Sequence, residues 1–271
     1  MNMGAIAIES TGTGSPVLFI HGLGGTSNVF GPQVGVLSRF FACHRFDLPG
    51  AGRSPSKETA TIDALVSSAL SVLDSLGLGV PVHVIGHSMG TIVAQHLAAK
   101  APDRVQSLAL IGPIHAPSPA ARAAFRDRAA KVRAQGMASI ADQVVAAGTS
   151  AETKAARPEI AAFVRELILR QESESYAQHC EAISVAVAAD LTGIEVPVLL
   201  ITGDEDNTSP VPASVTMASA LPDATLEILA RTGHWATLER PDEVSQLLVA
   251  FLFGRGRAPN SWTMSTSRIP P

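Results

Sequence analysis

Several kinds of residue are scarce in this chain of 271 residues, and each scarcity excludes some kinds of structure or function. Aromatic residues make up only 4% of the sequence, so a ligand pocket should be lined mainly by aliphatic side chains. The two cysteines, Cys43 and Cys180, do not sit at metal-ligand spacings, which favours a reduced, cytoplasmic protein. The net charge is −4 and no basic cluster is present, so we expect no nucleic-acid partner.

Long apolar segments are also missing. No run is long and apolar enough to span a bilayer, and the N-terminus lacks a basic stretch followed by an apolar one. We therefore expect no signal peptide and no membrane partner. The length, with a hydrophobic content of 46%, suits one large α/β domain or two small ones.

Short apolar runs alternate along most of the chain with segments of helical periodicity. The runs predict strands at residues 5–9, 17–20, 40–46, 82–85, 105–111, 196–201 and 225–229. Helical spacing follows at residues 62–76, 92–99, 211–220 and 241–253. This alternation is typical of βαβ units, so we expect an α/β fold in which helices cover both faces of a mainly parallel sheet.

The pattern changes between residues 114 and 190, where no strand is recognisable. Alanine, arginine, glutamate and glutamine dominate, with apolar residues such as Phe163 and Leu167 at helical spacing. We expect roughly four short helices that form a lid over a core made of residues 1–113 and 191–253. Residues 254–271 are rich in Pro, Ser and Arg and are predicted to be a disordered tail.

A Gly-His-Ser-Met-Gly sequence occupies residues 86–90, between a predicted strand and a predicted helix. This order suits a sharp turn that presents the Ser88 hydroxyl above the sheet edge, beside backbone N–H groups of the helix. The glycines provide positions without a Cβ where strand and helix come close. The same five residues also suit a glycine-flanked helix N-cap, so the partners of Ser88 decide between the two interpretations.

A serine hydroxyl needs a base within hydrogen-bond reach, and the base needs an orienting acid. His234 lies in a Gly-His turn after the last predicted strand and is the candidate base. Among the three acidic residues at 204–206, Asp206 is the candidate acid, because the third residue after such a glycine usually points back over the sheet. Asp204 is the alternative, although it also suits a turn that bonds to its own loop.

Other candidate binding residues come from the lid and from a glycine-rich loop. His115 and His179 border or lie in the lid, where they could contact a substrate. A His-Gly-Leu-Gly-Gly sequence at 21–25 directly follows a buried strand, and its glycines allow the backbone to aim an N–H group at a ligand. Because each of the main motifs follows a strand, we expect them to meet at the carboxyl edge of the sheet.

Taken together and in this order, the motifs resemble the α/β-hydrolase superfamily over nearly the whole chain. The matching segments are residues 21–25, 47–54, 86–90, 203–206 and 233–234. The resemblance implies a mainly parallel eight-stranded sheet with a helical lid. It also implies Ser88 as nucleophile, Asp206 as acid and His234 as base, with the backbone N–H groups of Leu23 and Met89 as the oxyanion hole.

Within the superfamily the chain is most similar to the 3-oxoadipate enol-lactonase-like and carboxylesterase group, through residues 86–95 and 176–183. The implied activity is hydrolysis of a small carboxylic ester or lactone through an acyl-enzyme, with no metal or cofactor. A C–C bond hydrolase or cofactor-free perhydrolase with the same triad, and a slow-turnover ligand receptor, are the alternatives. Gly22, Trp235 and Phe163 are further expected substrate contacts, and we expect a monomer or homodimer.

Overall fold

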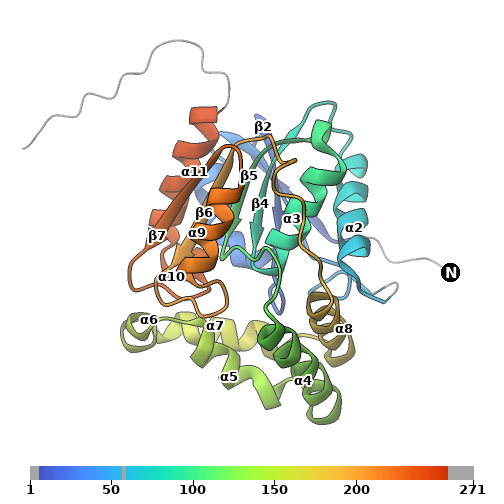
Figure 1. The fold of residues 1–271 in the computed structure, drawn as a ribbon, viewed down its shortest axis with the longest axis vertical. Helices are drawn as coiled ribbons and strands as arrows, with labels where there is room; N and C mark the ends of the chain where they lie inside the picture. The colour runs from blue at the N-terminus through green and yellow to red at the C-terminus, as the bar shows by residue number, and fades with distance from the viewer. Residues whose placement is uncertain (1–5, 57–58, 256–271) are drawn as a thin grey trace, which may run out of the picture.

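The computed structural model of the chain describes residues 6–56 and 59–255 (Figure 1). Of the predicted tail, residues 256–271 lie outside the described part, whereas residues 254 and 255 complete the last helix. In the described residues, no helix has both the length and the apolar character needed to cross a membrane. Cys43 and Cys180 are both buried and unpaired.

Seven strands form a single sheet in the described residues, in the order β1-β3-β2-β4-β5-β6-β7. They are β1 (Ile8–Thr11), β2 (Ser15–Ile20), β3 (Phe41–Phe46), β4 (Val82–His87), β5 (Val105–Ile111), β6 (Val198–Gly203) and β7 (Ala224–Leu229). β1 pairs with β3 antiparallel, and every other pairing is parallel, which confirms the expected α/β class. The resemblance implied eight strands, but the chain offers seven apolar runs of strand length, and each forms one strand.

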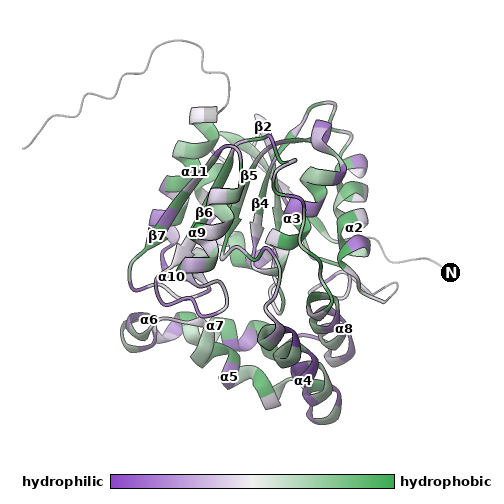
Figure 2. Cartoon of the chain, in the orientation of Figure 1, coloured by the Kyte–Doolittle hydropathy of each residue, from purple (hydrophilic) through white to green (hydrophobic). Residues whose placement is uncertain are grey.

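Two helical layers enclose the sheet because successive strand side chains point to opposite faces. In β2, Leu18 and Ile20 join one core, while Val17 and Phe19 join the other. The first core packs against α2 (Ile62–Ser75), α3 (Met89–Lys100) and α9 (Val211–Ala220). The second packs against α1 (Gly31–Leu37) and α11 (Pro241–Arg255). Figure 2 shows the hydrophobic colouring concentrated on the strands and on the helix faces that meet them.

Five helices fill the chain between β5 and β6 and pack together at one end of the sheet (Figure 1). They are α4 (Pro119–Gln135), α5 (Ala138–Gly148), α6 (Ala151–Ala156), α7 (Pro158–Leu169) and α8 (Ser173–Ser184). We call α4 to α8 the helical insertion. Roughly four short helices were expected, whereas five form in this segment. One of them, α4, is not short: it runs for 17 residues with no interior Gly or Pro before Gly136 ends it.

The helical insertion has a small core of its own, formed by side chains such as Val132, Ile140, Tyr176 and Cys180. Its helices contact one another mainly in the pairs α4 with α8 and α5 with α7. Shorter elements complete the chain: the 3-10 turns η1 (Ser27–Phe30) and η2 (Pro102–Arg104), and the four-residue α10 (Ala236–Glu239). α10 directly follows the loop that carries His234.

Candidate active site

Ser88 occupies the turn between β4 and α3. Its φ of 53° and ψ of −121° are strained for a residue with a Cβ, and such strain persists only where the surroundings enforce it. Gly90 permits the turn, because a Cβ at this position would clash with the carbonyl oxygen of Ile20 on β2. The serine hydroxyl is therefore held at the end of the parallel strands, in a residue that is 8% exposed.

His234 follows β7 and joins Ser88 to an acid. The Ser88 hydroxyl donates to Nε2 of His234 over 2.7 Å, and Nδ1 of the same ring donates to Oδ2 of Asp206 over 2.8 Å. The main chain of His234 is fixed as well, since its N–H donates to the carbonyl oxygen of Gly148 over 2.8 Å. Gly148 is the last residue of α5, so the helical insertion contacts the loop that carries this histidine.

Asp206 is held in place by its own loop as well as by the imidazole. Its side chain is buried, and Oδ1 accepts the N–H groups of Thr208 and Ser209, each over 2.8 Å. Burial disfavours the charged carboxylate, but the neighbouring His234 and these two N–H groups outweigh that effect and lower the pKa of Asp206. The carboxylate therefore stays ionised beside the imidazole near neutral pH.

Two polar neighbours bond to the main chain around His234. Asp204, the alternative acid, is exposed, and its Oδ1 accepts the N–H of Thr232 over 3.1 Å. His87 donates from Nε2 to the carbonyl oxygen of His234 over 2.8 Å. Burial and the proximity of His234 lower the pKa of His87 to about 3, so His87 is neutral at physiological pH. Both side chains support the loop that carries His234.

Leu23 and Met89 lie on two segments that meet at Ser88. Met89 is the first residue of α3, so its N–H has no partner within the helix. Leu23 follows Gly22, and a Cβ on Gly22 would lie only 2.6 Å from the Cβ of Ser88. His21 supports this loop, because its Nδ1 donates to the carbonyl oxygen of Gly22 over 2.9 Å. Both segments therefore lie beside Ser88.

A protein-family model described as alpha/beta hydrolase fold matches residues 15–241. The chain belongs to this family of hydrolases. It is 27% identical over 243 residues to the (E)-2-((N-methylformamido)methylene)succinate hydrolase of Acinetobacter baylyi, covering 89% of this chain and 91% of that protein. Two solved structures, each 29% identical, are also similar. A thermophilic esterase from Thermogutta terrifontis, with malate bound, has a TM-score of 0.88 and covers 92% of this chain and 93% of its own. The enol-lactonase of Burkholderia xenovorans has a TM-score of 0.86 and covers 91% and 96%.

The helical insertion of this α/β hydrolase packs directly on the loop that carries Leu23. Nε2 of Gln171 donates to the carbonyl oxygen of Gly24 over 3.2 Å. A Cβ on Gly24 would clash with Cδ1 of Ile168 and would lie 3.2 Å from Cε2 of Tyr176. Side chains of the insertion thus border the region around Ser88.

Three of the expected substrate contacts are packed in the core or bonded to the main chain. Trp235 is buried in the hydrophobic core on the α11 side of the sheet. His115 donates from Nε2 to the carbonyl oxygen of Ala189 over 2.9 Å. His179 is buried and donates from Nε2 to the carbonyl oxygen of Pro49, also over 2.9 Å. These bonds tie connecting segments together, and the structure does not bring these side chains into the hydrogen-bonded chain at Ser88.

Phe163, the remaining expected contact, lies on α7 and is 37% exposed. It lines a cavity of about 690 Å³ together with Thr26, Asp47 and Gln171. The cavity lies between α7 and the loops that follow β2 and β3. Within residues 6–56 and 59–255, no group of three or more His, Cys, Asp or Glu side chains is arranged to hold a metal ion.

Sequence reasoning missed the contacts that Gly148 and Gln171 make with the active-site loops. Gly148 could have been recognised as a helix end, since glycine often stops a helix, but nothing local links it to a histidine 86 residues later. The Gln171 contact spans 147 residues of sequence. Such contacts depend on how the insertion docks on the core, which no local pattern encodes.

Proposed function

We propose that this α/β hydrolase cleaves a small carboxylic ester or lactone through an acyl-enzyme. The observation that carries the proposal is the hydrogen-bonded chain from the Ser88 hydroxyl through His234 to Asp206, with distances of 2.7 and 2.8 Å. A serine hydroxyl becomes a useful nucleophile when a base takes its proton and an acid stabilises the charged base. The similarity to an esterase and an enol-lactonase supports an ester or lactone as the substrate.

In the proposed reaction, Oγ of Ser88 attacks the carbonyl carbon while Nε2 of His234 takes the hydroxyl proton. The N–H groups of Leu23 and Met89 donate to the oxyanion that forms. The C–O bond then breaks, and His234 protonates the departing alkoxide. A water molecule, deprotonated by His234, attacks the acyl carbon and releases the acid from Ser88. With a lactone, the alcohol stays attached to the acyl chain and a hydroxy acid is the product.

Asp206 supports both halves of this cycle. Because its carboxylate stays ionised, it favours the His234 tautomer that carries the proton on Nδ1, which leaves Nε2 free to accept from Ser88. When His234 becomes positively charged, the buried carboxylate stabilises that charge over 2.8 Å. The role proposed for Asp206 is therefore orientation and charge stabilisation, with no proton transfer to the carboxylate itself.

A small substrate suits the surroundings of Ser88. Ser88 is 8% exposed and His234 is 7% exposed, and Ile168 and Tyr176 press on the adjacent loop at Gly24. The neighbours of this loop are one aliphatic and one aromatic side chain. Short acyl chains or small lactone rings should therefore fit better than long chains.

A substrate panel tests the proposal. Wild-type protein should hydrolyse p-nitrophenyl esters from acetate to octanoate, or γ- and δ-lactones, and a fluorophosphonate should label Ser88 in mass spectrometry. Ser88→Ala should retain the far-UV circular dichroism spectrum and lose about 10³-fold or more of the activity, as expected for loss of a triad nucleophile. A variant that keeps more than about a tenth of the rate would place the nucleophile elsewhere. A burst of product followed by almost no turnover would indicate a ligand receptor instead.

A further inference from the structure

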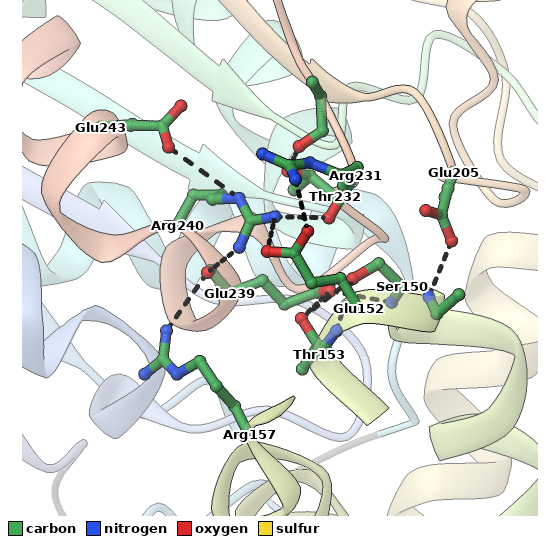
Figure 3. Close-up of polar contacts among 12 residues, drawn as sticks. Ser150, Glu152, Thr153, Arg157, Glu205, Arg231, Thr232, Glu239, Arg240 and Glu243 are labelled. Carbon is green, nitrogen blue, oxygen red and sulfur yellow. Dashed lines mark hydrogen bonds and ion pairs between the residues drawn. The ribbon is translucent and has the colours of Figure 1, made fainter. Parts of the chain in front are cut away.

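A second cluster of polar side chains joins the helical insertion to the loops that carry His234 and Asp206. Figure 3 shows it, with these labelled members: Ser150, Glu152, Thr153, Arg157, Glu205, Arg231, Thr232, Glu239, Arg240 and Glu243. Its centre is the connection between α5 and α6, residues 148–153, which we call the α5–α6 junction. One buried carboxylate in this cluster, that of Glu239, lies against the junction.

Glu239 is the last residue of α10 and is fully buried. Its Oε2 accepts two hydrogen bonds from the junction, one from the N–H of Ser150 and one from the hydroxyl of Thr153, each over 2.8 Å. Its Oε1 is buried and has no hydrogen-bond partner in the described part of the chain. A buried acceptor without a partner costs stability, so a role limited to holding α6 does not explain why the carboxylate is there.

The unpartnered oxygen faces the residue that precedes the catalytic base. A Cβ on Gly233 would lie 2.9 Å from Oε1 of Glu239, 2.7 Å from the carbonyl oxygen of Gly148 and 2.8 Å from the nitrogen of Ser150. That same Gly148 carbonyl accepts the N–H of His234. Glu239, the junction and the main chain at His234 therefore form one packed unit with no room for a shift of the loop toward α6.

The other carboxylates of the cluster make more exposed contacts. Glu205 is partly exposed, and its Oε2 accepts the N–H of Ala151 over 2.8 Å. Glu152, whose side chain is 37% exposed, pairs over 3.0 Å with Arg231, which is 71% exposed, and over 2.9 Å with Arg240, which is 12% exposed. Exposed ion pairs contribute little, typically below about 1 kcal/mol. Glu152 therefore offers a matched control on the same turn of α6.

We propose that Glu239 is a positioning residue for the reaction. Through Ser150, Thr153 and Gly233 it holds the main chain of His234, so that Nε2 stays within reach of Ser88. The inference rests on the function proposed above. A displacement of a reacting group by about 1 Å can cost on the order of 10²-fold in rate. Because Glu239 touches no substrate, its loss should act on kcat and leave KM nearly unchanged.

Four variants test this role, assayed with p-nitrophenyl acetate well below the unfolding temperature of each. Glu239→Ala should lower kcat about 10- to 100-fold and change KM less than about threefold, as misplacement of His234 requires. Glu239→Gln keeps an oxygen that can accept from Ser150 and Thr153, and should restore kcat to within about threefold of wild type. Thr153→Val removes one of the two donors to Glu239, so its kcat should lie between those of Glu239→Ala and Glu239→Gln. Glu152→Gln, the control, should match wild type.

Thermal melts and kcat measured on the same variants separate the possible outcomes. If Glu239→Ala lowers only the melting temperature and the folded enzyme keeps its kcat, then Glu239 only stabilises the fold and the inference is overturned. An equal loss of kcat in Glu152→Gln overturns it too, because general loosening of α6 would then be the cause. If Glu239→Ala does not fold, Thr153→Val decides, and an unchanged kcat there contradicts the proposal.

The rate of fluorophosphonate labelling at Ser88 distinguishes this inference from the proposed function. A wild-type protein that is not labelled overturns both, since no activated serine is present to be aligned. A wild-type protein that is labelled but hydrolyses no ester or lactone overturns the proposed substrate class alone. If labelling of Glu239→Ala is then as fast as that of wild type, the positioning role is wrong.

Discussion

Mild acid should destabilise this hydrolase, because burial lowers the pKa values of several of its histidines, His21 and His44 among them. His83, His87 and His179 are 1%, 0% and 2% exposed, and burial lowers their pKa values to about 4, 3 and 4. In the unfolded chain each has a pKa of about 6.5. Between about pH 4 and 6.5 the unfolded chain therefore binds more protons than the folded protein, and the free energy of unfolding decreases as the pH falls.

The size of the effect follows from proton linkage. Between pH 7.5 and 5.5, a histidine that protonates only in the unfolded chain lowers the free energy of unfolding by an amount on the order of 1 kcal/mol. His83, His87 and His179 together give a few kcal/mol, a large share of the roughly 5–15 kcal/mol that stabilises a typical protein. Carboxyl groups add little in this window, because their pKa values in the unfolded chain are about 4.

Urea unfolding at pH 7.5 and 5.5, followed by circular dichroism, measures this difference. In His83→Gln the difference should shrink by about 1 kcal/mol, because one titrating group is gone. Ser107→Ala is the matched control: its hydroxyl bonds to Nδ1 of His83 over 2.7 Å, so the variant loses stability at both pH values but keeps the pH difference. A wild-type difference below about 1 kcal/mol, or an unchanged difference in His83→Gln, would show that these histidines titrate normally in the folded protein.

Asp206→Asn should lower kcat about 10⁴-fold and Asp204→Asn far less, because only the former is expected to disturb the tautomer of the base; the reverse order in steady-state assays would make Asp204 the acid. Gly112→Ala should lower kcat, since Gly112 has a φ of 57° and a Cβ there would lie 3.0 Å from the His234 ring. Wild-type kinetics would show that the ring can shift away from the added methyl group without loss of activity. Ile168→Ala should shift the ratio of kcat/KM for octanoate over acetate esters at least about tenfold toward the longer chain, since each methylene is worth about 1–3 kcal/mol. An unchanged ranking of the esters would place specificity in other segments.

The features that the sequence reveals best are those that depend on a few adjacent residues. The turn at Ser88 is recognisable because Gly86 and Gly90 flank a serine between an apolar run and a helical pattern. The helix predicted at 211–220 coincides with α9, whose start is marked by Pro210 and Pro212. In both cases the residues that allow the prediction are close neighbours in the sequence.

Features set by pairing or docking were predicted less well. The first strand was expected at residues 5–9, but β1 spans Ile8–Thr11, because its pairing with β3 decides where it begins and ends. The hydrogen bond from Ser150 to Glu239 joins residues 89 apart in sequence, and neither residue belongs to a recognisable motif. From the sequence alone, a buried carboxylate of this kind cannot be distinguished from a solvent-exposed acid near a helix end.

The contacts of the α5–α6 junction also determine where this enzyme can be recombined with its relatives. Exchanging all of residues 114–190 would replace the segment that positions the Gly148 carbonyl group for His234 and both donors for Glu239. Crossover points placed inside the insertion, so that residues 145–157 stay with the parent sheet, would leave those bonds intact. The exchangeable units are then residues 119–135 and 158–184, and libraries built on these boundaries should yield more active hybrids than whole-insertion swaps.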